Sequence, residues 1–215
     1  MPLHIAPSLA SAPLDRLGEV IHSLDSAGAD LIHFDVEDGS FTPVMTLGTK
    51  IIKDLRRFTK LPFDIHLMMV NPEWILPDLV SYGADRISVH YEACPYPRRV
   101  LRQISALGAQ AGLAFNPASP LPDLSHLSPY LSFVVILTTE PEISDCPFLP
   151  KVLDKLRKHR RVAGLEGIEW VVDGGVSVEN LPEIKNAGAD TVVVGRAVFK
   201  EDKITENLAA LRAAV

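Results

Sequence analysis

The sequence predicts a single domain over residues 1–215 with the α/β fold of a (β/α)8 TIM barrel. A Gly-Ala-Asp or Gly-Ala-Gln turn, beginning at Gly28, Gly83, Gly108 and Gly188, ends a helical pattern and precedes an apolar run each time. The glycines are spaced by about two, one and three lengths of a unit of about 27 residues, which suits one strand and one helix. Eight such units account for the 215 residues, and alternating strands and helices favour a closed parallel barrel.

Eight short apolar runs are the predicted strands. In order, they cover residues 4–6, 31–36, 63–67, 86–90, 110–115, 132–137, 168–172 and 191–194. Each run is bounded by turn residues, as buried parallel strands are. Apolar residues at helical spacing lie between the runs, for example Leu17, Val20, Ile21 and Leu24. This spacing predicts helices that cross from one strand to the next.

Composition and charge argue against several classes of protein. The net charge of −6 argues against nucleic acid as a partner, because binding the phosphate backbone needs a basic surface. The sequence shows no run of 18 apolar residues and no signal-peptide pattern, so we expect neither a membrane span nor secretion. Cys94 and Cys146 form no disulfide framework, which favours a reducing, cytoplasmic location.

Polar side chains gather at one end of the predicted strands. Because side chains alternate along a strand, His33, Asp35 and Glu37 share one face of the second strand. Other polar groups at strand ends are Ser8, Asp64, His66, His90, Glu92, Asn116 and Asp173. The carboxyl ends of the strands form the rim where TIM barrels perform chemistry. Three aspartates of the other rim, Asp30, Asp85 and Asp190, are interpreted as turn or capping residues.

Two histidines and two carboxylates at this rim, His33, Asp35, His66 and Asp173, can converge on one divalent ion. Imidazole with carboxylate suits Zn²⁺, with Fe²⁺, Mn²⁺ or Co²⁺ as alternatives, better than Ca²⁺ or Mg²⁺. Asp35 and Asp173 come from different strands and could flank a substrate as acid and base. Together these residues predict metal-assisted proton transfer beside a carbonyl group, with the ion stabilising an enediolate.

Six motifs follow one another along almost the whole chain. They are Ile5-Ala6-Pro7-Ser8, His33-Phe34-Asp35-Val36 with Asp38-Gly39, Asp64-Ile65-His66-Leu67-Met68, Val89-His90 with Glu92, Asn116-Pro117-Ala118 with Pro120, and Val172-Asp173-Gly174-Gly175-Val176. In this order they resemble the ribulose-phosphate 3-epimerase family, a TIM barrel of the ribulose-phosphate-binding type. The resemblance implies His33, Asp35, His66 and Asp173 as metal ligands, with Asp35 and Asp173 also serving as the paired acid and base.

The resemblance also implies inversion at C3 of a ketose phosphate, between ribulose 5-phosphate and xylulose 5-phosphate, by an isomerase of the pentose phosphate pathway. One aspartate would remove the C3 proton and the other would reprotonate the opposite face, while the ion holds the enediolate. The resemblance places the substrate-contacting serine at Ser8. The other substrate contacts that we expect are His66, Met68, Gly174, Gly175, Gly195 and Arg196. Family members are usually homo-oligomers, so we expect one here.

Three features depart from the family pattern. Glu37 and Leu137 stand where the family usually has methionines that cap the enediolate, so that Met68 alone remains of this cap. Residues 140–146 replace a glycine-rich loop, and their acidic groups would repel phosphate. Arg196 replaces a small residue and could hold phosphate or carboxylate through a bidentate guanidinium.

These departures leave the substrate open. One alternative is the same enolisation chemistry on another sugar phosphate, or on a sugar acid held by Arg196. A second is a non-catalytic barrel that binds a ligand or partner, which the four ligand-type residues disfavour. A metal-free decarboxylase is also disfavoured. Enzymes of that kind typically carry an Asp-x-Lys-x-x-Asp signature, and here Glu37 occupies the lysine position. Arg196 could instead point to solvent or pair with Glu142 or Asp145.

Overall fold

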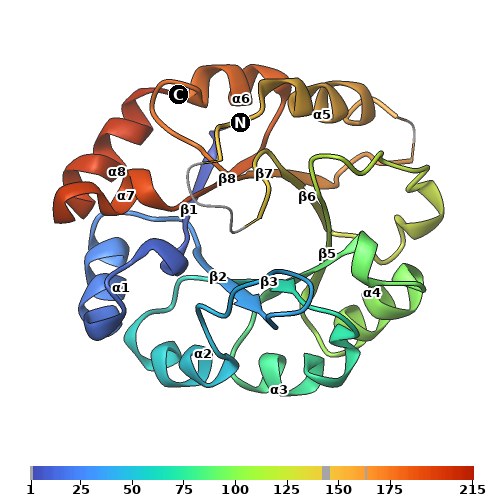
Figure 1. Cartoon of the computed structure of the whole chain (residues 1–215), viewed down its shortest axis with the longest axis horizontal. Helices are drawn as coiled ribbons and strands as arrows, with labels where there is room; N and C mark the ends of the chain where they lie inside the picture. Colours follow the sequence, from blue (N-terminus) through green and yellow to red (C-terminus); the bar gives the residue numbers. More distant parts are fainter. Residues whose placement is uncertain (1, 142–145, 163) are drawn as a thin grey trace.

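The protein folds as eight parallel strands in one sheet, in the order β1-β8-β7-β6-β5-β4-β3-β2, surrounded by helices (Figure 1). The computed structural model describes residues 2–141, 146–162 and 164–215. The strands are β1 (His4–Pro7), β2 (Ile32–Glu37), β3 (Phe63–Met68), β4 (Arg86–His90), β5 (Gln110–Phe115), β6 (Phe133–Leu137), β7 (Glu169–Asp173) and β8 (Thr191–Val194). This arrangement confirms the predicted TIM barrel.

Helices lie between successive strands and cover the outside of the sheet (Figure 1). The α-helices are α1 (Leu17–Ser26), α2 (Thr49–Leu55), α3 (Leu76–Ser81), α4 (Pro97–Ala106), α5 (Leu153–His159), α6 (Leu181–Ala187), α7 (Arg196–Phe199) and α8 (Ile204–Ala213). The 3-10 helices are η1 (Leu9–Ser11), η2 (Leu14–Arg16), η3 (Arg56–Phe58), η4 (Pro72–Trp74), η5 (Tyr91–Ala93), η6 (Ser125–Leu127), η7 (Pro150–Val152) and η8 (Lys200–Asp202). Among the described residues, no helix combines the length and apolar character that a membrane crossing requires.

The predicted strand bounds are correct for β4, β5 and β8 and differ by one residue at one or both ends elsewhere. The differences at the carboxyl ends of β2 and β7 have one cause. Glu37 pairs with Met68, and Asp173 pairs with Leu137, so these site-type residues still belong to the ladder. A polar residue therefore marks the end of a strand in the sequence one position too early.

The barrel closes at a thin seam between β1 and β2. β1 pairs with β8 along its whole length, from His4 beside Thr191 to Pro7 beside Val194. A single parallel bridge, between Ser8 and His33, joins its far end to β2. The seam therefore closes beside the predicted site.

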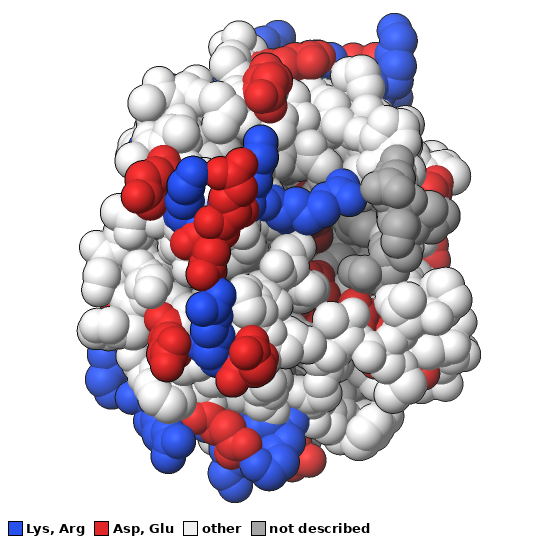
Figure 2. Space-filling model, turned by 60° about the vertical axis from the view of Figure 1, so that its left-hand side comes forward, with Lys and Arg blue, Asp and Glu red and all other residues white. Residues whose placement is uncertain are grey.

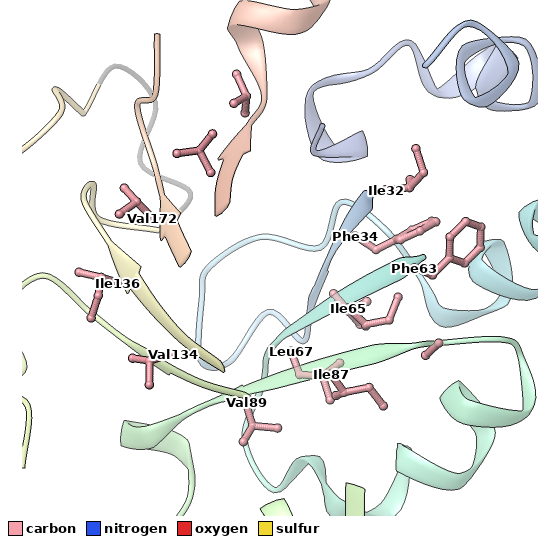
Figure 3. Close-up of a cluster of buried hydrophobic side chains, with 14 of the residues drawn as sticks. Ile32, Phe34, Phe63, Ile65, Leu67, Ile87, Val89, Val134, Ile136 and Val172 are labelled. Carbon is pink, nitrogen blue, oxygen red and sulfur yellow. The ribbon is translucent and has the colours of Figure 1, made fainter. Parts of the chain in front are cut away.

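The two faces of the sheet bury different kinds of side chain. Alternate apolar residues point away from the barrel axis toward the helices, as Phe34, Ile65 and Val89 do in Figure 3. Inside the barrel, a separate apolar cluster contains Ala6, Leu31, Ala114, Phe133, Val135, Leu137, Val171 and Val193. The strands β2, β3 and β4 instead place polar side chains at the alternate positions: His33, Asp35, Asp64, His66, Arg86, Ser88 and His90, all buried. The side of the barrel interior formed by β2, β3 and β4 is thus polar.

Arg86, the first residue of β4, lies on this polar side of the interior and pairs with two carboxylates. Its Nη1 donates to both carboxylate oxygens of Glu169, at 3.0 and 2.9 Å, and its Nε lies 3.3 Å from Oδ1 of Asp64. The guanidinium carbon lies 4.2 Å from the ring centroid of Phe133. Thr191 donates to Glu169 through its hydroxyl, at 2.5 Å. A buried cation thus joins β3, β4 and β7 from inside the barrel, since a charge is tolerated in the interior when it is paired.

The three aspartates interpreted as turn or capping residues join neighbouring strands. Asp85 accepts a hydrogen bond from the N–H of Phe63, at 2.8 Å, and pairs with Arg56. Asp190 likewise accepts from Trp170, at 2.9 Å, and its two oxygens accept from Arg160. Asp30 repeats the arrangement with Ile5 and Arg212. Each carboxylate therefore fixes the start of the adjacent strand, and none of these hydrogen bonds caps a helix.

Candidate metal centre and active site

A cavity of about 410 Å³ opens at the carboxyl ends of the strands. The predicted site residues that line it are Ser8, Asp35, Met68, Asp173, Gly174, Gly175, Gly195 and Arg196. In Figure 2 the molecule is hollowed near the middle of the face, and acidic side chains lie at the bottom of the hollow. The cavity is therefore at the rim where the sequence predicted chemistry.

Four polar side chains from β2, β3 and β7 converge beneath this cavity. His33, Asp35, His66 and Asp173 each offer one ligand atom, and these atoms all lie within 4.8 Å of one another. Oδ1 of Asp35 lies 3.1 Å from Nε2 of His33 and 3.3 Å from Nδ1 of His66. Oδ2 of Asp173 lies 3.6 Å from Nδ1 of His66. The structure brings the predicted ligand set together, and its role as a metal centre remains a prediction.

The surroundings of His66 fit a metal ion. Its ring is buried, and its Nδ1 has no hydrogen-bond partner among the described residues, although two carboxylates are close by. An unsatisfied buried nitrogen costs free energy unless something else binds it. A divalent cation between His66, Asp35 and Asp173 would satisfy this nitrogen and offset the negative charge of the carboxylates. The donor set of two imidazoles and two carboxylates is one that transition metals accept.

His33 is oriented by a second carboxylate. Its Nδ1 lies 2.8 Å from Oδ2 of Asp64, which is 1% exposed, while its Nε2 faces Asp35. An ionised carboxylate only accepts, so the bond to Asp64 holds a proton on Nδ1 and leaves Nε2 as the candidate ligand. Arg86 lies on the other side of Asp64. Asp64 therefore contacts both Arg86 in the barrel interior and His33 of the candidate metal centre.

The charges of the cluster shift the pKa values of His33, Asp35 and His66. Burial alone would lower the pKa of His66, but Asp173 and Asp35 outweigh this effect and raise it to about 9. The pKa of His33 is likewise raised, because Asp35 and Asp64 outweigh the effect of burial. Burial would raise the pKa of Asp35, yet His33 and His66 lower it far below its usual range. Asp35 is therefore an ionised carboxylate at neutral pH, as a proton acceptor must be.

Ser8 orients the other oxygen of Asp35. Its hydroxyl donates to Oδ2 of Asp35 at 2.5 Å, across the seam between β1 and β2. The sequence predicted Ser8 as a substrate contact, and the residue does line the cavity. Its hydroxyl fixes the rotation of the Asp35 carboxylate.

The far side of the cavity is formed by close-packed backbone after β7 and β8. Gly174 and Gly175 have φ angles of 106° and 67°, a region that side chains other than glycine rarely adopt. A Cβ at Gly174 would meet Oγ1 of Thr139 at 2.4 Å, and one at Gly195 would meet Oγ of Ser11 at 2.5 Å. Glycine at these positions therefore allows the backbone to pack this closely against Thr139 and Ser11.

Arg196 begins α7 and is exposed beside this backbone, where it lines the cavity. Glu142 and Asp145, its predicted alternative partners, lie outside the described residues. Glu140 and Cys146, on either side of that segment, do line the cavity. Glu140, the first residue of the replaced loop, therefore borders the same space as Arg196.

Glu37 does not join the ligand cluster, although it shares a strand face with His33 and Asp35. It is buried, and its Oε2 accepts from the N–H of Thr46. This bond holds the loop between β2 and α2. Met68, which remains of the family's apolar cap, and Leu137, which stands where the family usually has a methionine, both line the cavity.

Several residues near the site were not assigned from the sequence. Thr139 and Ser177 line the cavity, and Thr138 donates to the carbonyl oxygens of Asp173 and Gly174, at 3.0 and 2.6 Å. The pair Thr138-Thr139 directly follows an apolar strand, a signal that could have identified it. Thr138 anchors the glycine turn that follows Asp173.

Comparisons with known proteins agree with the geometry. The model of the "Ribulose-phosphate 3 epimerase family" matches residues 4–199. A ribulose-phosphate 3-epimerase of Synechocystis sp. is 42% identical over 97% of this chain and 92% of its own length. The enzyme of that name from Escherichia coli K12 is 42% identical, covering 92% and 89%, and that from Bacillus subtilis is 36% identical, covering 98% of each chain.

Solved structures of lower sequence identity share the fold. A 3-keto-L-gulonate-6-phosphate decarboxylase from Vibrio cholerae superposes with a TM-score of 0.73 at 18% identity, covering 100% of this chain and 97% of that one. The tryptophan synthase α-subunit of Pyrococcus furiosus gives 0.71 at 17% identity, covering 99% and 98%. These two likenesses show only the barrel. The family match and the closely similar relatives show more: this chain belongs to the ribulose-phosphate 3-epimerase family and is an epimerase.

Proposed function

We propose that residues 1–215 form one catalytic domain that interconverts ribulose 5-phosphate and xylulose 5-phosphate by metal-dependent inversion at C3. The observation that carries this proposal is the convergence of His33, Asp35, His66 and Asp173 within 4.8 Å of one another at the bottom of a cavity. The names of the relatives support the choice of substrate.

Asp35 and Asp173 act as the acid and base of the proposed reaction. Both line the cavity, from β2 and β7, so both can reach a bound ketose phosphate. One carboxylate removes the C3 proton, and the other, protonated, delivers a proton to the opposite face. The hydroxyl of Ser8 keeps the Asp35 carboxylate in one orientation during this transfer.

His33, Asp35, His66 and Asp173 would hold a divalent transition metal, with Zn²⁺ as the first choice and Fe²⁺, Mn²⁺ or Co²⁺ as alternatives. When bound, the ion would stabilise the negative charge that develops on the enediolate oxygens. Met68 and Leu137 line the same cavity with apolar groups and reduce the access of water to the reacting carbon. Backbone amides at Gly175 and Gly195, together with Arg196, bind the phosphate.

The test of this function is turnover in D₂O. Ribulose 5-phosphate should be converted to an equilibrium mixture with xylulose 5-phosphate, with deuterium entering at C3, as observed by NMR. A parallel panel of hexulose phosphates and sugar acids tests the alternative substrates that Arg196, Glu37 and Leu137 leave open. Exchange confined to another member of the panel would reassign the substrate, and no exchange in any would refute enolisation.

A metal-binding prediction follows from the ligand set. We expect purified protein to carry one divalent transition metal ion per chain, and the variants His66→Ala and Asp173→Ala to lose it. His126→Ala, at an exposed histidine outside the cluster, should keep the ion. Elemental analysis measures the content. Full activity in the presence of chelator, together with an absence of metal from wild-type protein, would refute the metal centre.

Arg196 is expected to bind the anionic end of the substrate. Arg196→Ala should raise KM, because it removes charge-assisted hydrogen bonds to the substrate. The expected loss of binding free energy is about 1.5–3 kcal/mol. The effect should be much smaller for an unphosphorylated analogue. Arg102→Ala, which removes an exposed arginine on α4, serves as the matched control. If Arg196→Ala and wild type have equal kinetics on the best anionic substrate, Arg196 does not hold the anion.

A further inference from the structure

His90 and Glu92 lie behind the ligand cluster and have no role in the proposed reaction. His90 ends β4 and is fully buried, and Glu92 follows it in η5. Nε2 of His90 lies 2.9 Å from Nε2 of His66, and Nδ1 of His90 lies 3.2 Å from Oε2 of Glu92. Neither residue is among the described residues that line the cavity. They are therefore placed to act on His66 and not on a substrate.

The nitrogens of His90 and His66 that carry protons can be derived from the hydrogen bonds of Glu92. Oε1 of Glu92 accepts from the N–H of Asn116 at 2.8 Å, and an ionised carboxylate offers acceptors only. Nδ1 of His90 must then carry the proton that it shares with Oε2 of Glu92. A neutral imidazole protonated on Nδ1 has a lone pair on Nε2. Nε2 of His66 must accordingly be the donor of the bond between the two rings.

We infer that Glu92 and His90 form a hydrogen-bonded relay that keeps the proton of His66 on Nε2 and directs the lone pair of its Nδ1 toward Asp35 and Asp173. Both are positioning residues, since they act through His66. The inference rests on the proposed function, because the metal ion is what would use this lone pair. A metal ion bound to this lone pair would satisfy Nδ1 of His66, which has no hydrogen-bond partner among the described residues.

The opposite proton order conflicts with the structure. A proton on Nε2 of His90 would leave a lone pair on its Nδ1, facing the Glu92 carboxylate at 3.2 Å. It would also require a neutral His66 to accept through Nε2 and to carry its proton on Nδ1, where the ligand is needed. Both consequences are unfavourable, because a buried acceptor opposite another acceptor has no compensating bond.

Neighbouring groups contact each part of the relay. The rings of His66 and His90 are inclined by only 21°, and their facing nitrogens are much closer than their centroids, which are 4.9 Å apart, so the rings meet at their edges. The ring of Phe41 packs against His90 with centroids 4.5 Å apart. Nζ of Lys155 donates to the carbonyl oxygens of Asn116 and Pro117, at 2.9 and 2.7 Å. Lys155 thus fixes the loop whose N–H holds Glu92.

The two histidines of the cluster are therefore oriented in different ways. His33 bonds directly to the carboxylate of Asp64 and presents Nε2, whereas His66 reaches the carboxylate of Glu92 through an intervening imidazole and presents Nδ1. Outer partners of this kind fix the tautomer of a metal-binding histidine.

The direct test is the tautomer of His90 in wild-type protein. Two-bond ¹H–¹⁵N correlation spectra of protein labelled with ¹⁵N-histidine, recorded metal-free and with Zn²⁺, distinguish Nδ1–H from Nε2–H. The signals of His90 are identified by their loss in His90→Gln. We expect His90 to carry its proton on Nδ1 in both states, and His66 to bind Zn²⁺ through Nδ1. A proton on Nε2 of His90 would overturn the relay.

Metal affinity provides the second measurement, by competition with a chelating indicator. His90→Phe keeps the ring shape but removes the acceptor, and should weaken Zn²⁺ binding by about 10- to 100-fold. His90→Gln, whose amide oxygen can accept from His66, should recover most of this loss. His22→Phe, the same substitution at an exposed histidine on α1, should bind as wild type does. Unchanged affinity in folded His90→Phe would overturn the inference.

The two proposals can fail separately. If wild-type protein binds no metal ion, the proposed metal-dependent function is refuted, while the His90 tautomer in the metal-free protein still decides the relay. If wild type binds the ion and His90 is protonated on Nε2, the relay is refuted and the proposed function stands.

Discussion

Asp35→Asn and Asp173→Asn should each reduce kcat/KM for epimerisation by about 10³-fold or more, since general acid–base catalysis contributes about 10²–10⁴-fold. Asparagine keeps the shape of aspartate but cannot take up the C3 proton. A loss of 10³-fold corresponds to about 4 kcal/mol of transition-state stabilisation. Either variant can retain exchange of the C3 hydrogen of one epimer, because one face keeps its carboxylate. This asymmetry would identify which aspartate serves which face.

The measurement combines steady-state kinetics, exchange from D₂O and metal content of the same samples, because both aspartates belong to the ligand cluster. Asp54→Asn is the matched control, since Asp54 is an exposed carboxylate that pairs with Lys50 on α2. Its kinetics should equal those of wild type. Turnover near the wild-type rate in either active-site variant, with metal bound, would refute the assignment of acid and base.

Arg86→Met should lower the free energy of unfolding by about 3–5 kcal/mol, because it leaves a buried carboxylate without its cation. Asp64 is 1% exposed, and Arg86 itself is 5% exposed. Methionine preserves apolar contact with Phe133 but provides no donor for Glu169. The effect should be measured by urea unfolding of metal-free protein, so that metal binding does not contribute.

The loss should depend on pH in a defined direction. Burial raises the pKa of Asp64, but the charge of Arg86 and the bond from His33 outweigh it, so that the pKa is lowered. A carboxyl group with a lowered folded-state pKa stabilises the protein above its unfolded pKa of about 3.9 and loses this contribution as pH falls. The difference between wild type and Arg86→Met should therefore narrow in acid.

Two variants test the mechanism of this destabilisation. Arg99→Met breaks the pair between Arg99 and Glu73 at the surface and should cost less than about 1 kcal/mol. Adding Asp64→Asn to Arg86→Met should restore part of the stability, because the unpaired charge is removed. A loss below about 1 kcal/mol in Arg86→Met alone would show that the pair is not required.

The fold could be predicted because its signals are local and repeated. The glycine turns, such as those at Gly83 and Gly188, end one helix and precede the next strand, and they recur at multiples of one unit. Alternation also placed Phe34 and Asp35 on opposite faces of their strand before any pairing was known. The exact strand ends were less accessible, because the ladder continues through Glu37 and Asp173 for reasons of pairing and not of polarity.

The contacts that orient the site depend on how the barrel closes and could not be predicted in the same way. Arg86 meets Glu169 across the interior, 83 residues away in the chain, and the sequence near Arg86 contains no sign of its partner. The contact between His66 and His90 likewise depends on the stagger of β3 against β4. The sequence places His66 and His90 at the same rim of the barrel, but only the structure shows which nitrogen faces which atom.

The seam between β1 and β2 also determines when the site can form during synthesis. β1 leaves the ribosome early, but it forms its ladder with β8, at residues Thr191–Val194. Until then the growing half-barrel keeps open edges, which favour association with other chains, and the pairing of distant segments is slow. The bond between Ser8 and Asp35 lies at the carboxyl end of β1, and the pairing with β8 holds this end on its other side. A nascent chain therefore completes its catalytic end when its last strand arrives.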